Sequence, residues 1–96
     1  EDNLEEIFSE ISNRGIKIQM MENGARSFSM CVQCEEEKLL SLQASLKSRY
    51  KMRYNANVTL ITIRHYRTED LQKMESQTIL LEQKNRTIAR FVVQNA

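Results

Sequence analysis

The 96-residue sequence contains no proline and no tryptophan, and its only glycines are Gly15 and Gly24. A glycine-rich phosphate-binding loop needs several closely spaced glycines, so this kind of nucleotide site is excluded. The two glycines instead indicate single backbone positions, such as a helix end or a turn. No apolar run is long enough to cross a bilayer, and no signal peptide opens the chain. We therefore expect a cytoplasmic protein with no membrane partner.

Side chains that bind metals or act as nucleophiles are also scarce. The sequence has two cysteines, Cys31 and Cys34, and one histidine, His65. A structural zinc site needs four such ligands, and residues three apart on a strand face opposite sides, so the Cys-x-x-Cys spacing is interpreted as accidental. His65 has no recognisable catalytic motif around it, which favours a structural or interface role. We expect no metal, no cofactor and no catalytic residue in this fragment.

The charge balance argues against nucleic acid as a partner. The formal net charge is only +1, from 14 basic and 13 acidic residues. A basic run at residues 47–53 is interpreted as a solvated helix face and a guarded strand edge. Residues 27–33 offer serine, cysteine and glutamine on their polar face, whereas RNA-binding folds of similar topology stack bases on exposed aromatic residues.

At this length one modest domain, or two very small ones, should associate with another copy or domain.

The first half of the chain changes from helical to strand periodicity. Apolar residues recur at three- and four-residue spacing and predict a helix over residues 3–14 that ends at Gly15. Alternation over residues 16–21 predicts a strand, and Asn23-Gly24 predicts a tight hairpin turn. Residues 27–34 predict the returning strand, with Phe28, Met30, Val32 and Cys34 on its covered face.

A second helix is predicted over residues 36–50, followed by a short edge strand at Lys51–Asn55. One strand upstream of Glu1 would complete the βαββαβ order of the ferredoxin-like plait, an α+β fold. The chain opens on Glu1 without a methionine, which suggests that the natural protein extends upstream. We therefore expect residues 1–56 to form a first domain whose first strand is missing.

The second half predicts another, shorter set of elements. The apolar run VTLITIRHY predicts a strand over residues 58–66, and a short helix follows over residues 68–74. Two further strands are predicted at residues 78–83 and 87–94. This βαββ set spans residues 57–96 and is incomplete, because it needs one more strand from elsewhere.

The best candidate for a binding site is the start of the first helix. The unpaired backbone amides around Asp2, Asn3 and Leu4 suit a carboxylate group. The adjoining strand end at Ile18 and Gln19 offers carbonyls and a carboxamide for an ammonium group. The alternative is an ordinary capped helix packed on a sheet, with no ligand.

Four strings carry a family resemblance: LEEIFSEISNRGIKIQMM, NGARSFSMCV, LITIRHY and ILLEQKNRTIARFVV. Together they resemble the C-terminal regulatory region of bacterial monofunctional aspartate kinases, which is built from paired ACT domains. The resemblance implies two βαββαβ units, the first inserted within the second, which accounts for the incomplete second unit. It also implies feedback inhibition by an end-product amino acid, lysine or threonine, and a homodimer formed through the ACT domains. The attached kinase domain, with its ATP and Mg²⁺, lies outside these residues, so this fragment should not phosphorylate aspartate.

The resemblance also implies an effector site that holds the carboxylate, the α-amino group and the far end of the amino acid. By position these residues are, in that order, Asp2, Asn3 and Leu4, then Ile18 and Gln19, then the polar turn of Asn23 and Gly24. Lysine-sensitive family members often carry an aspartate where Gln19 stands, so the effector stays open between lysine and threonine. A structural dimerisation module without an effector is the alternative function.

Overall fold

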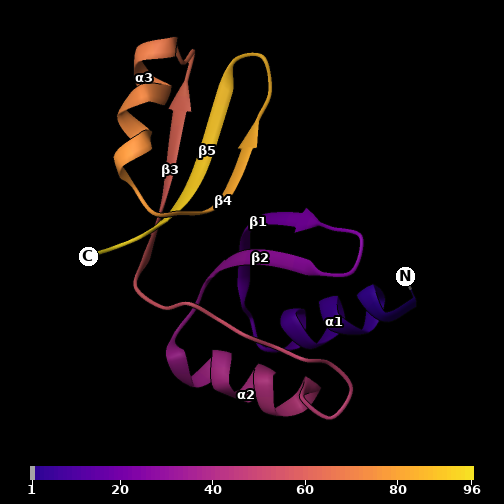
Figure 1. Cartoon of the computed structure of the whole chain (residues 1–96). Helices are drawn as coiled ribbons and strands as arrows, with labels where there is room; N and C mark the ends of the chain where they lie inside the picture. The colour runs from indigo at the N-terminus through magenta and orange to yellow at the C-terminus, as the bar shows by residue number, and fades with distance from the viewer. Residues whose placement is uncertain (1) are drawn as a thin grey trace. The chain divides into compact units, whose positions relative to one another are not determined.

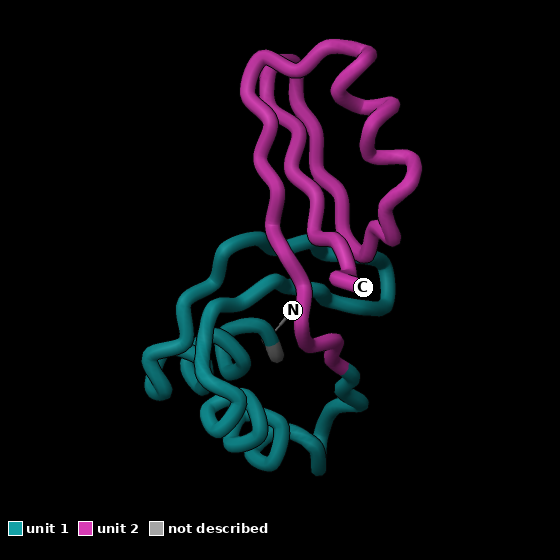
Figure 2. Tube along the Cα trace, turned by 90° about the vertical axis from the view of Figure 1, so that its left-hand side faces the viewer, with its two compact units in different colours: residues 1–53 teal, residues 54–96 magenta. Residues whose placement is uncertain are grey.

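The computed structural model describes residues 2–96, with side chains from Leu4 onward. The chain forms two compact units, residues 1–53 (unit 1) and residues 54–96 (unit 2), as Figure 2 shows. Both sheets are antiparallel and each unit carries helices, so the fold is α+β. In chain order the elements are α1 (Asp2–Asn13), β1 (Lys17–Asn23), β2 (Phe28–Gln33), α2 (Glu36–Leu46), β3 (Val58–Arg64), α3 (Thr68–Lys73), the 3₁₀ helix η1 (Met74–Ser76), β4 (Ile79–Lys84) and β5 (Ile88–Gln94) (Figure 1).

The end of α1 is set by Gly15, as the sequence predicts. Gly15 has a φ of +68°, in the left-handed region that favours glycine. Its N–H donates to the carbonyl of Ser12 at 3.0 Å, and the N–H of Ile16 donates to the carbonyl of Ile11 at 3.2 Å. These two bonds form a Schellman motif, which satisfies the last free carbonyls of the helix. The chain thereby leaves α1 in the direction of β1.

The core of unit 1 lies between the two helices and the hairpin of β1 and β2. Both helices lie on the same side of the hairpin (Figure 1). The buried centre consists of Ile11, Ile16, Leu42 and Leu46, against which Phe8, Met30, Val32 and Cys34 pack. Phe8 meets Phe28 edge to face, with ring centroids 5.7 Å apart, a favoured aromatic geometry. The predicted covered face of β2 is therefore confirmed.

A row of polar contacts, here named the interhelical row, joins α1 to α2 and the turn after it. Along each of the two segments, successive partners are four residues apart. The residue numbers rise along one segment as they fall along the other, so the two helices run antiparallel. The contacts are Arg14 Nε to Ser41 Oγ at 3.0 Å, Ser45 Oγ to Glu10 Oε1 at 3.0 Å, and Arg49 Nη1 to Glu6 Oε2.

The same row sets the charge state of Glu10. Its carboxylate accepts from Arg14 Nη1 at 2.6 Å as well as from Ser45. The hydrogen bond from Arg14, and then that from Ser45, lowers the pKa of Glu10. Glu10 therefore stays ionised at neutral pH, and its carboxylate stabilises the contact between the two helices. The contribution is lost as pH falls through the lowered pKa of the folded state.

The hairpin reverses where the sequence predicts, but its turn differs from the predicted tight Asn23-Gly24 turn. Asn23 is the last residue of β1 and pairs with Phe28, so the loop comprises residues 24–27. The N–H of Gly24 donates to the carbonyl of Ser27 at 2.8 Å. Gly15 is the glycine with positive φ, and Gly24 is not, so the turn lacks the left-handed conformation that a two-residue type I′ turn needs. The prediction of a two-residue turn was wrong because Asn23 belongs to β1, where it pairs with Phe28, and the loop between the strands has four residues.

The predicted edge strand at Lys51–Asn55 is also wrong, since residues 51–56 have no regular structure. In a βαββαβ plait the last strand pairs with the first, and none of the residues described here supplies that first strand. Extended backbone without a partner gains no ladder of hydrogen bonds, so the segment does not become a strand. The sheet of unit 1 accordingly has β1 and β2 alone. The second helix is shorter than predicted as well, ending at Leu46 and passing into a turn.

Unit 2 contains a sheet in the order β3-β5-β4 with α3 on one face. Its buried centre consists of Met74, Ala89, Phe91 and Val93, with Ile61, Ile63 and Leu71 packed against it. The order first, third, second is that of the first three strands of a ferredoxin-like plait, so the arrangement is compatible with that fold. β3 and β4 are the two edges of this sheet.

Replacing Gly15 with alanine tests the helix end. The added Cβ would have space, because the nearest heavy atom is Lys38 Nζ at 3.6 Å. The cost is therefore one of backbone conformation, and we expect Gly15→Ala to lower the free energy of unfolding by about 1–2 kcal/mol in urea denaturation. Gly15→Asn is the matched variant and should cost less, since asparagine tolerates left-handed φ. Equal losses for both variants would contradict this explanation.

Candidate functional site

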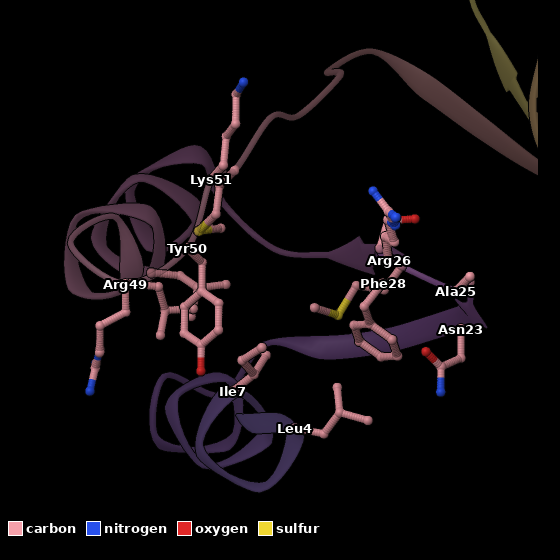
Figure 3. Close-up of a pocket in the computed structure, with 15 residues that line it drawn as sticks. Leu4, Ile7, Asn23, Ala25, Arg26, Phe28, Arg49, Tyr50 and Lys51 are labelled. Carbon is pink, nitrogen blue, oxygen red and sulfur yellow. The ribbon is translucent and has the colours of Figure 1, made fainter. Parts of the chain in front are cut away.

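One cavity of about 790 Å³ lies within unit 1 and opens to solvent (Figure 3). It is bounded by the first two turns of α1, the tip of the hairpin and the C-terminal end of α2. The lining comprises Leu4 and Ile7 of α1, residues 23–28 and Met30 of the hairpin, Leu42 and Leu46 of α2, and residues 49–52. Its volume falls within the range of ligand pockets, roughly 300–1,000 Å³.

The inside of this cavity is apolar and its cations lie at the rim. Ile7 and Phe28 face each other across it, and Leu4 points between α1 and the hairpin tip (Figure 3). Arg26 and Lys51 direct their charged ends away from this apolar centre (Figure 3). The cavity therefore offers apolar surface within and positive charge around it, a combination that suits a small molecule with an anionic group.

Polar groups enter the cavity wall at Tyr50. Its hydroxyl donates to Glu6 Oε1 at 3.1 Å, while Arg49 pairs with the other oxygen of the same carboxylate. Burial, and then the hydrogen bond to Glu6, raises the pKa of Tyr50 above its usual value. Tyr50 therefore stays protonated and donates its hydroxyl hydrogen to Glu6 of α1, which links this part of the cavity wall to that helix.

The structure brings together three of the seven effector residues expected from the sequence. Leu4 lines the cavity from α1, and Asn23 and Gly24 line it from the hairpin tip. The side chains of Asp2 and Asn3 lie outside the described residues. The backbone of α1 begins at Asp2, so its first amides lie at the end of the helix that carries Leu4.

Ile18 and Gln19 do not line this cavity. Ile18 packs on the core of unit 1, between the helices and the sheet. Gln19 is the extra residue of a β-bulge, since Ile18 pairs with Val32 and Met20 pairs with Cys31. Its Nε2 donates to Gln33 Oε1 at 2.8 Å. The two halves of the expected site are therefore separated, with the ammonium-binding positions away from the cavity.

The cavity also includes residues that the sequence did not single out as site residues, chiefly Tyr50 and Met52. Tyr50 continues the four-residue spacing of Leu42 and Leu46, a signal that could have placed it on the same face of the chain. Met52 lies in the segment that was predicted to be a strand, and that prediction did not place it at the site.

The other features that the sequence analysis considered lie elsewhere in the chain. Among the described residues, no three His, Cys, Asp or Glu side chains gather as a metal site would need. Cys31 and Cys34 are both partly buried. His65 has a φ of +55° at the end of β3, and its N–H donates to the carbonyl of Thr87, so its backbone closes the strand pairing. None of the described helices has the length and apolar character to span a membrane.

Comparison of the chain with protein-family models, with curated proteins and with solved structures finds no match in any of the three.

The raised pKa of Tyr50 makes the cavity wall sensitive to alkali. Because the folded state disfavours the tyrosinate, the contribution of Tyr50 to stability is present below pH 10 and is lost as pH rises toward the raised pKa. We expect ultraviolet titration to reveal one tyrosine that ionises above the usual range, and Tyr50→Phe to remove it. Glu6→Gln should move that ionisation toward lower pH. An unchanged late ionisation in Tyr50→Phe would contradict the assignment.

Proposed function

We propose that this chain is an amino-acid-binding regulatory region of an aspartate kinase, made of two ACT-type units. Lysine or threonine would bind in unit 1 and inhibit the attached kinase domain. The observation that carries the proposal is the convergence of Leu4, Asn23 and Gly24 on one cavity. From the resemblance of the sequence to such regions, we expect these three positions to lie together, although Leu4 is about twenty residues from Asn23 and Gly24 in the chain.

The chemistry of the cavity supports an amino acid as its ligand. The first turn of α1 presents backbone amides that have no partner within the helix, and the positive end of the helix dipole is there too. These amides suit the carboxylate of the effector. The apolar wall of Ile7 and Phe28 suits the methylene stem of lysine or the methyl group of threonine. Asn23 and Ser27 at the hairpin tip supply polar groups for the other end of the ligand.

Regulation would follow from where the cavity lies rather than from any reaction in it. An effector seated there contacts α1 and the hairpin at once, so it stabilises one arrangement of the two. The interhelical row connects α1 to α2, so a shift of α1 on binding would also move α2. Such differential binding shifts a population of two states, and coupling between sites is typically worth about 1–3 kcal/mol.

A structural dimerisation module without an effector is the second candidate. It is favoured by the nature of the cavity wall, which includes Leu42 and Leu46 of the buried core and Met52 beside them. The cavity also lies next to the segment at residues 51–56 that finds no strand to pair with. On this second hypothesis the space is filled by apolar groups of another strand, and no amino acid binds.

Calorimetric titration with lysine and with threonine, each paired with a thermal melt, tests the proposal. We expect saturable heat and a raised melting temperature with one of the two. Asn23→Ala should weaken binding about fivefold, which corresponds to one lost hydrogen bond of about 1 kcal/mol. Glu22→Ala is the matched control, because Glu22 is the preceding exposed residue of β1 and does not line the cavity.

Gln19→Ala distinguishes the two halves of the expected site. If the effector sits in the cavity, this variant should bind with unchanged affinity. Weaker binding in Gln19→Ala with normal binding in Asn23→Ala would move the site to the bulge in β1. No heat and no change in melting temperature with either amino acid would refute the effector proposal and favour the structural module.

A further inference from the structure

Asn23 and Gly24 form the only asparagine–glycine pair in the sequence, and both residues are exposed at the tip of the hairpin. Such a pair is chemically labile, because the backbone nitrogen that follows an asparagine can attack the carbon of its side-chain amide. A side chain on the following residue hinders this approach, and glycine has none. The sequence thus places one reactive peptide unit beside the cavity of unit 1.

The structure leaves the side chain of Asn23 unrestrained. Its carboxamide makes no hydrogen bond to any of the described residues, and it points toward the side of the hairpin where Leu4 lies (Figure 3). The side chain of Asn85 is held instead, because its Oδ1 accepts from two backbone N–H groups at 2.9 and 2.8 Å. At Asn23 the bond that has to open is the one from Gly24 N–H to the carbonyl of Ser27.

We infer that Asn23 is a site of spontaneous deamidation, with water as the only co-reactant. After Gly24 N loses its proton to water, it bonds to Cγ of Asn23, and ammonia leaves to give a succinimide ring. Water then opens the ring at one of its two carbonyl carbons. Breaking the bond from Gly24 N to Cγ gives aspartate, and breaking its bond to the main-chain carbonyl carbon gives isoaspartate. In total an amide and water become a carboxylic acid and ammonia.

The product changes the chemistry of the cavity, a consequence that rests on the proposed function. The described lining includes the cations Arg26, Arg49 and Lys51 but no aspartate or glutamate. Aspartate at position 23 places a carboxylate on that lining, at the hairpin tip where the far end of the effector lies. A carboxylate attracts the side-chain ammonium of lysine, whereas the side chain of threonine carries no charge. Deamidation therefore shifts the selectivity of the cavity toward lysine.

Peptide mass mapping after incubation in mildly alkaline buffer tests the modification without any ligand. We expect aspartate and isoaspartate to accumulate at position 23 of the folded chain. Asn23→Gln should give neither product, because the longer side chain disfavours ring closure. Failure of Asn23 to react in the folded chain, under conditions where it reacts in urea, would overturn the inference.

Arg86→Gly is the matched variant, since it creates a second asparagine–glycine pair at Asn85. Two hydrogen bonds to the Asn85 carboxamide must break there, against one bond at Gly24. Position 85 should therefore react about fivefold more slowly than position 23 in the folded variant, and at a similar rate in urea. Equal rates at the two positions in the folded variant would contradict the role given to the unrestrained carboxamide.

Calorimetry with lysine and with threonine tests the change in selectivity. Asn23→Asp reproduces the aspartate product, and its dissociation constant for lysine relative to that for threonine should fall about tenfold. Asn23→Ala removes the carboxamide without adding charge, so it should leave this ratio unchanged. An unchanged ratio in Asn23→Asp, with measurable binding, would refute the change in selectivity. Absence of binding in every form would refute the proposed function and this consequence with it, whereas the mass mapping decides the deamidation of Asn23 independently.

Discussion

The hydrogen-bonding demand of strand backbone governs both units of this protein. Each N–H and C=O that is removed from water must find a partner, and a strand exists only where a neighbour supplies the bonds. β5 meets this demand on both sides, and it contributes the buried residues Ala89, Phe91 and Val93. Residues 51–56 find no neighbour and stay irregular. Which segments form strands and which stay irregular therefore depends on where a neighbouring strand is available.

The cavity in unit 1 is a consequence of the same demand. The core of α1 and α2 is built to cover a sheet, but the sheet beneath them has two strands. The interhelical row joins the two helices to each other through Glu6, Glu10 and Arg14. The space left between Phe28 and Tyr50 is therefore lined by core-type residues and by the polar hairpin tip. This mixed lining is why an amino acid and a further strand are the two competing occupants.

Local patterns predicted those features that depend on neighbouring residues alone. Gly15 ends α1 because its left-handed φ is a property of one residue and its next few bonds. The covered face of β2 followed from alternation, since Met30 and Val32 must face the helices if Phe28 does. The bulge at Gln19 had no such signal, because it arises from how β1 aligns with β2 across the hairpin. The separation of Gln19 from the cavity was therefore beyond local reasoning.

By itself, the sequence determined the α+β class and the type and order of the helices and strands that form, but it also predicted a strand at residues 51–55 that does not form. These features depend on periodicity and on single residues such as Gly15. Only the tertiary structure decided that Leu4, Asn23 and Tyr50 share one cavity, that residues 51–56 are not a strand and that β3 is an edge of its sheet. Each of these depends on contacts between distant segments, and no local pattern records which partner a strand edge will meet.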